Sequence, residues 1–169
     1  MTVGARMPWL TQDQVQNYGL WLQSGAIFLS FVGVIISAMV TRGVARRRAT
    51  LDLIMSEQTT ELMIELRKKF LALKRDGQLV KYAMSDQMTS EEAAVLRATL
   101  NRYELIAIGI REKTLNARVY HSYGRSTLVG DWIACKPWVV QRRQTMNNPK
   151  LYEHVEALAR KWAKAGENC

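Results

Sequence analysis

The feature that most constrains this chain is a long uncharged run near its N-terminus. No charged residue occurs between Asp13 and Arg42, and most residues inside that gap are apolar. At about 1.5 Å per residue, a helix built from this run spans roughly 30 Å, which is the thickness of a hydrocarbon core. The run therefore predicts one transmembrane helix over residues 20–41, preceded by an N-terminal tail over residues 1–19.

Basic residues on one side of the apolar run predict its orientation. The cluster consists of Arg42, Arg46, Arg47 and Arg48. Before the run, Arg6 and Asp13 cancel each other. Basic residues close to a membrane helix tend to stay in the cytoplasm. We therefore expect an extracytoplasmic tail and a basic cytoplasmic domain over residues 42–169.

A cleaved signal peptide is the alternative interpretation of the same run. Ser37, Ala38 and Met39 offer small residues near its end. A signal peptide carries its positive charge before a shorter apolar core, whereas the arginines here follow the run. This order favours a retained membrane anchor.

The net charge of +9 lies in the part after the membrane segment. Such a domain favours anionic partners, namely lipid headgroups, an acidic cytoplasmic protein or nucleic acid. Membrane topology alone also requires a positive cytoplasmic face. Nucleic-acid binding is the least expected, because lysines and arginines are spread over every predicted helix instead of forming one stripe. The two cysteines, Cys135 and Cys169, share no metal-ligand spacing and are expected to be free thiols.

The soluble part predicts an all-α fold, a small helical bundle. Every segment with a clear period repeats its apolar residues at helical spacing, and no segment alternates as a half-buried strand does. Residues 60–75 form one such helix, and Gly77 is its expected C-cap. Thr89 and Glu92 form a capping-box pattern that opens a helix ending near Arg111.

Two further helices are expected toward the C-terminus. One begins near Asn116, and Pro137 is expected to break or kink it. The last takes Asn148 as its N-cap and ends at Gly166. The expected loops lie around Ser56 and over residues 76–89.

Motifs for catalysis, metal binding or cofactor binding are absent from the sequence. His121 and His154 are the only histidines, and neither belongs to a ligand or general-base motif. No glycine-rich phosphate loop and no nucleophile elbow occurs. We therefore expect neither an enzyme nor a bound cofactor.

One polar constellation is unusual. Arg97, Asn101, Glu104 and Arg111 share one side of the helix expected to begin at Ser90, beside its apolar stripe. We expect Asn101 and Glu104 to be partly buried and structural. Glu104 could pair with an arginine from another helix, such as Arg142 or Arg143, and its burial would require good hydrogen bonds. A solvated flank without specific contacts is the alternative, and a catalytic or ligand-binding role for Asn101 and Glu104 comes third.

Several segments resemble a known family. They are Arg48-Ala49-Thr50 with Asp52 and Ile54, then Asn101-x-x-Glu104-x-Ile106-Ala107-x-Gly109-Ile110, Trp132, Arg142-Arg143 and Asn148-Pro149-x-Leu151-Tyr152. Together they resemble the bacterial and phage family catalogued as domain of unknown function 4760, over roughly residues 46–162. The resemblance implies a bacterial inner-membrane protein tethered by one N-terminal helix, and it implies no reaction.

Small residues line one side of the predicted membrane helix. They are Ala26, Ser30, Gly33 and Ser37. Helices in hydrocarbon associate through close backbone approach at such positions. We expect this seam to pair with a second copy or another membrane helix, although small residues are common enough in membrane helices for the stripe to arise by chance. The leading function is thus a membrane-anchored, non-enzymatic interaction or accessory module.

Overall fold

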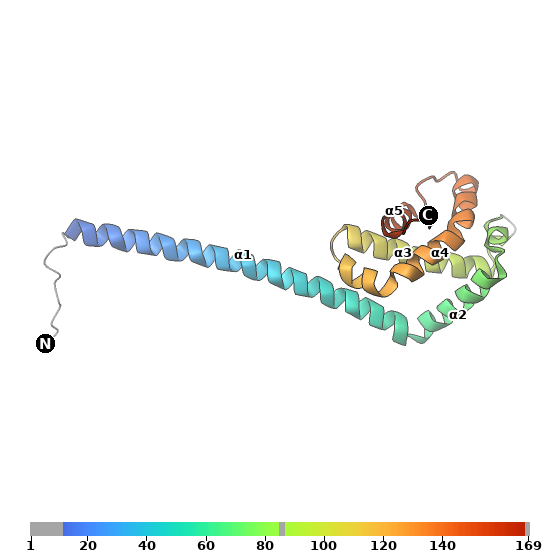
Figure 1. The fold of residues 1–169 in the computed structure, drawn as a ribbon, viewed down its shortest axis with the longest axis horizontal. Coiled ribbons are helices and arrows are strands. Elements are labelled where there is room, and N and C mark those ends of the chain that lie inside the picture. Colours follow the sequence, from blue (N-terminus) through green and yellow to red (C-terminus); the bar gives the residue numbers. More distant parts are fainter. Residues whose placement is uncertain (1–11, 85–86, 168–169) are drawn as a thin grey trace. The chain divides into compact units, whose positions relative to one another are not determined.

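The computed structural model describes residues 12–84 and 87–167, and within these ranges the fold is all-α as predicted (Figure 1). The elements are α1 (Gln12–Thr59), α2 (Glu61–Asp76), η1 (Leu79–Ala83), α3 (Glu91–Arg111), α4 (Ala117–Thr145) and α5 (Glu153–Trp162). The chain divides into two compact units, residues 1–44 and residues 45–169. Helix α1 contributes to both units.

Helix α1 is longer than the predicted membrane segment at both ends. It begins at Gln12, before the expected start at residue 20, so part of the predicted 1–19 tail is helical and residues 1–11 lie outside the described ranges. It also continues to Thr59, and the expected loop around Ser56 is wrong. The Ser56 hydroxyl donates a hydrogen bond to the Leu53 carbonyl at 2.8 Å, so this residue bonds within the helix.

Helix α2 follows its local signals. It ends at Asp76, and Gly77 takes a left-handed conformation with φ 71° as the expected C-cap. Glu61 lies in the first turn, and Lys74 and Arg75 lie in the last turn. At these positions each charge interacts favourably with the helix dipole. The following loop contains the short 3-10 helix η1, which the sequence did not indicate.

Helix α3 begins one residue later than the capping box predicted. Ser90, and not Thr89, is the N-cap, and its hydroxyl accepts a hydrogen bond from the Ala93 amide at 3.1 Å. Both residues have the side chain that this position requires, so the local pattern alone did not distinguish them. The predicted end at Arg111 is confirmed.

Helix α4 starts as predicted, and of the break or kink expected at Pro137, the break does not occur. The Asn116 side chain accepts from the Val119 amide at 3.1 Å, and the Asn116 amide donates to the buried Thr50 hydroxyl of α1 at 2.8 Å. The helix runs through Pro137 to Thr145. Proline removes one backbone hydrogen bond. The residues on both sides of it are nevertheless buried in the core, namely Trp132, Cys135, Trp138 and Val139. Burial of this face keeps α4 one helix.

The expected N-cap of the last helix is wrong. Asn148 accepts from the Lys150 amide at 3.2 Å and stabilises a turn, and α5 begins later, at Glu153. The residue that precedes α5 is Tyr152, whose φ of 60° lies in the left-handed region. The helix ends at Trp162, before the predicted Gly166.

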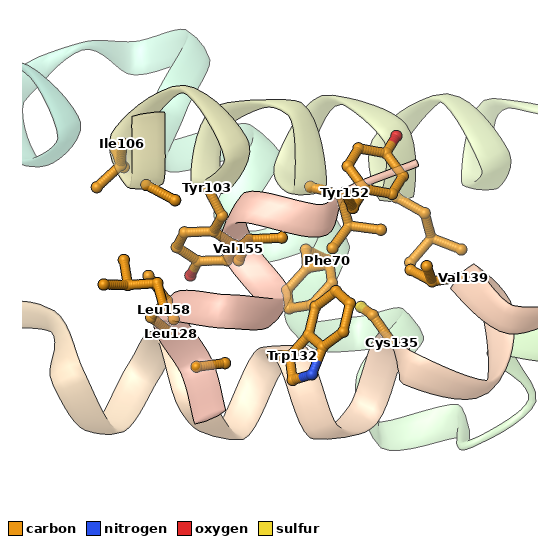
Figure 2. Close-up of a cluster of buried hydrophobic side chains, with 14 of the residues drawn as sticks. Phe70, Tyr103, Ile106, Leu128, Trp132, Cys135, Val139, Tyr152, Val155 and Leu158 are labelled. Atoms are coloured by element: carbon orange, nitrogen blue, oxygen red, sulfur yellow. The ribbon is translucent and has the colours of Figure 1, made fainter. Parts of the chain in front are cut away.

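The core of the second unit is formed by large side chains from α2, α3, α4 and α5. Figure 2 shows Phe70, Tyr103, Trp132 and Val155 pointing toward one another from these four helices. None of the four is more than 1% exposed. Burial of such side chains contributes roughly 1.5–3 kcal/mol each, so this cluster fixes how the four helices pack.

Candidate functional site

Glu104 binds the N-terminus of α5. Its carboxylate oxygens accept hydrogen bonds from the backbone amides of His154 at 3.2 Å and Val155 at 2.8 Å. The predicted pairing with Arg142 or Arg143 is therefore wrong. Backbone amides of a first helical turn lack hydrogen-bond acceptors within the helix, and they carry the positive end of its dipole. A carboxylate at this place supplies the acceptors and a favourable negative charge.

Asn101 holds the residue just before α5. Its side-chain oxygen accepts from the Tyr152 hydroxyl at 3.0 Å. The expectation that Asn101 is partly buried is wrong, because the residue is exposed. The Tyr152 ring is buried and lies 6.4 Å from the Trp138 ring. These contacts offset the cost of a left-handed conformation in a non-glycine residue, which is of order 1–3 kcal/mol.

The other residues of the predicted constellation lie at different places. Arg143 donates twice to the Leu151 carbonyl, at 2.9 and 2.8 Å, and pairs with Glu156 at 2.7 Å. Arg111 lies 3.0 Å from the His154 ring. Arg97 instead donates to the Met88 carbonyl at 2.6 Å. We call the residues that bind the start of α5 the α5 clasp: Asn101, Glu104 and Arg143.

Among the residues that the structure describes, Arg142 is buried without a carboxylate partner. Its guanidinium carbon lies 5.7 Å from the centre of the Trp138 ring, and Nη2 lies 3.1 Å from the Met146 sulfur. Its Nε and Nη1 atoms are buried without a hydrogen-bond partner. Stacking on the indole is thus the main contact that the chain provides for this charge.

A buried carboxylate that was not predicted from the sequence lies where α4 meets α2 and α3. The Asp131 side chain is 2% exposed, and Lys74 donates to it at 2.8 Å. The Tyr103 hydroxyl donates to its Oδ2 at 2.7 Å, and Arg67 pairs with the same oxygen. Burial, followed by the Asp131 charge, raises the pKa of Tyr103, so the hydroxyl stays a donor. We call Asp131 and these three partners the Asp131 cluster.

A cavity of about 430 Å³ lies beside this cluster, between the end of α1 and helices α2, α3 and α4. Its charged lining residues are Glu57, Arg67, Lys68 and Arg102, and we call it the Glu57 cavity. Arg102 Nε faces Glu57 Oε1 at 3.5 Å, yet neither atom makes a hydrogen bond to any residue in the ranges that the structure describes. Burial raises the pKa of Glu57, and the charges of Arg102 and Arg67 oppose part of that rise.

Part of this site left a weak signal in the sequence. Asp131 interrupts the buried face of α4 between Leu128 and Cys135, so a carboxylate stands at the spacing of a core position. Glu57 and Arg102 left no such signal, because nothing local indicates that they meet. Among the described residues, no three His, Cys, Asp or Glu side chains converge as metal ligands do.

Residues 25–162 match the family described as Domain of unknown function (DUF4760). The match covers most of the chain, and it begins before Arg46, where the sequence resemblance was expected to start. No curated protein and no solved structure is significantly similar to the chain. The chain therefore belongs to the DUF4760 family.

Proposed function

We propose that this chain is a single-pass protein of a bacterial inner membrane, whose helical domain acts as a non-enzymatic interaction or accessory module in the cytoplasm. The observation that carries the proposal is the surface of α1. Its large apolar side chains are exposed, with Trp21 at 78%, Leu29 at 71% and Phe31 at 68%. Each square ångström of apolar surface left in water costs roughly 25 cal/mol, and a hydrocarbon core removes that cost.

Two observations favour a retained anchor over a cleaved signal sequence. The arginines follow the apolar run, whereas a signal sequence needs its charge before the run. The family match also begins at residue 25, so it includes most of the apolar segment. A segment shared with the family domain is expected to remain in the mature protein.

A basic groove beside the start of α4 supports contact with anionic lipid. Its volume is about 590 Å³, and its charged lining residues are Arg46, Arg47, Lys113 and Arg118. No carboxylate lines it. Arg46 follows Thr41 by five residues, so it lies within about 18 Å of the end of the apolar run even if the chain is extended. Each cation near an anionic bilayer surface contributes about 1 kcal/mol.

The contacts of Asn101 and Glu104 with α5 favour a structural role for both residues over ligand binding. The nucleic-acid alternative has no observation that favours it over lipid. The module is therefore expected to act through a protein partner or through the cavity described above. Crosslinking in intact membranes followed by mass spectrometry identifies such a partner without presupposing its nature.

The orientation is tested with a membrane-impermeant maleimide. Cys169 should remain unlabelled in intact spheroplasts and become labelled after lysis, because the arginine cluster keeps the domain inside. Cys135 does not interfere, since it is fully buried and burial, followed by the Asp131 charge, raises its pKa to about 12. In the matched control, Thr2→Cys combined with Cys169→Ser, labelling should not require lysis. Labelling of Cys169 before lysis contradicts the orientation.

The small-residue seam of α1 is expected to mediate association of the membrane helix. The Ser30 hydroxyl bonds to the Ala26 carbonyl at 2.8 Å, and a Cβ on Gly33 would contact nothing within 4 Å. A shallow groove along this side is lined by Ser30, Gly33 and Ser37 among others. The surface is thus open to a second helix, and close packing there is the available attraction in hydrocarbon.

Replacing Gly33 and Ser37 together by leucine should abolish self-association in a membrane two-hybrid assay, because the larger side chains keep two backbones apart. Val32→Leu with Ile36→Leu is the matched control, with the same spacing on a different side of the helix. The control pair should associate like the natural chain. Equal association of both variants removes the seam as an interface.

A further inference from the structure

We propose that the Glu57 cavity binds a small organic oxyanion, with a carboxylate or phosphate group held by Arg102 and Arg67. Every residue that the proposal uses lies in the second unit of the chain. The proposal therefore does not depend on the membrane anchor.

The ion pair at the base of the cavity is incomplete. The Glu57 side chain is only 9% exposed and that of Arg102 only 17%, but the 3.5 Å between them has no hydrogen-bond geometry. Buried charged groups in folded proteins are nearly always hydrogen-bonded. The terminal nitrogens of Arg102 donate no hydrogen bond within the part of the chain that the structure describes. Its guanidinium therefore retains donors for a ligand.

The charge balance around the cavity favours an anion. Arg67, Lys68 and Arg102 line it against one carboxylate, Glu57. Asp131, which pairs with Arg67, does not line the cavity and is also bound by Lys74. The lining thus keeps an excess of positive charge, and planar guanidinium groups bind carboxylate and phosphate through paired hydrogen bonds.

The remaining lining fits an organic body better than a bare inorganic ion. Met63, Ile64 and Leu71 of α2 provide apolar surface, and Tyr120 and Tyr123 of α4 provide aromatic rings. The volume of about 430 Å³ falls within the range usual for small-molecule sites. An inorganic anion alone would leave this apolar surface in contact with water.

Two features of α4 favour ligand binding on its side of the cavity. The Tyr123 hydroxyl accepts a hydrogen bond from Gln58 Nε2 at 2.6 Å, so its own proton remains available to a ligand oxygen. Gly124 leaves room for the neighbouring ring, since a Cβ there would lie 3.0 Å from Tyr120 Cε1. An alanine at this position would already require the Tyr120 ring to shift by a few tenths of an ångström.

Glu57 has a distinct part in the proposal. Its carboxylate lies 3.5 Å from Arg102 without a hydrogen bond, and its negative charge opposes the approach of an anion to that guanidinium. Glu57→Gln removes that opposing charge and should tighten binding several-fold. Arg102→Gln removes the main donor and should weaken binding roughly ten- to a hundredfold, the range for a hydrogen bond to a charged group.

The test uses isothermal titration calorimetry on the full chain in detergent micelles. The probes are benzoate, phenyl phosphate and benzyl alcohol. All three contain a phenyl ring, but the first carries a carboxylate, the second a phosphate and the third only a neutral hydroxyl group. Benzoate or phenyl phosphate should bind, and the stronger of the two identifies the oxyanion. Benzyl alcohol should bind at least tenfold more weakly. Arg75→Gln is the matched control, because it removes an exposed charge of α2 that does not line the cavity.

Four outcomes would overturn the proposal. They are absence of binding by both anions, equal binding of the alcohol, equal losses in Arg102→Gln and Arg75→Gln, and weaker binding in Glu57→Gln. If Arg102→Gln fails to fold, Glu57→Gln alone decides, since only an anion bound beside Glu57 should bind more tightly on loss of that carboxylate.

Discussion

Asp131→Ala is expected to destabilise the helical domain by about 3 kcal/mol, because it leaves the Tyr103 hydroxyl and two partly exposed cations without their buried carboxylate. Lys74 and Arg67 approach Asp131 from α2, and Tyr103 approaches it from α3. All three would lose their common partner at once. Chemical denaturation followed by circular dichroism measures the loss, with the free energy of unfolding as the quantity compared.

Asp76→Ala is the matched control for this change. Asp76 pairs with Lys81 at 3.2 Å, but both side chains are nearly half exposed, so the loss should stay within about 1 kcal/mol. Asp131→Asn keeps the shape and an acceptor while removing the charge, and it should fall between the two. Similar stabilities of the Asp131→Ala and Asp76→Ala variants contradict a structural role for the Asp131 cluster.

Glu104→Ala is expected to cost about 1–3 kcal/mol, since it removes two hydrogen bonds to the first turn of α5 and a charge that opposes the helix dipole. The effect should be local. Amide hydrogen exchange of His154 and Val155 should accelerate more than exchange in the core of α4. The measurement is hydrogen exchange followed by mass spectrometry of the C-terminal peptides.

Two further variants make this expectation specific. Glu104→Gln keeps an acceptor oxygen and should retain most of the protection. Glu65→Ala removes an exposed carboxylate of α2 and should leave exchange in α5 unchanged. If Glu104→Ala leaves both stability and exchange unchanged while cellular function is lost, the residue acts in binding and not as part of the α5 clasp.

Helix boundaries that depend on adjacent residues were predictable. Gly77 ends α2 through its own left-handed conformation, and the Asn116 side chain accepts a hydrogen bond from the first turn of α4. Both predictions are confirmed. The start of α5 was not predictable in this way. Asn148 and Pro149 have the residue types of a helix start, but the buried Tyr152 ring and its bond to Asn101 delay the helix to Glu153. Tertiary contacts therefore overrode a good local signal.

The polar sites were less predictable than the helices because their partners are distant in sequence. Asp131 pairs with Lys74 and Arg67, which precede it by 57 and 64 positions in the chain. A single sequence gives no indication of such pairs. The position of Glu104 beside the apolar stripe of α3 did indicate a structural role. Its partner was misassigned to an arginine, because periodicity locates a side chain on a helix face and does not show that a helix terminus packs against it.

The burial of Cys135 has a consequence for oxidation of the protein. With a pKa of about 12, its thiolate fraction near neutral pH is on the order of one part in 100,000, and the thiolate is the form that attacks a disulfide. The side chain is also fully buried, on the face of α4 that packs in the core of the domain. Disulfide-linked dimers formed under mild oxidation are therefore expected to join Cys169 of two chains, which makes oxidative crosslinking a direct measure of how closely these two residues approach each other.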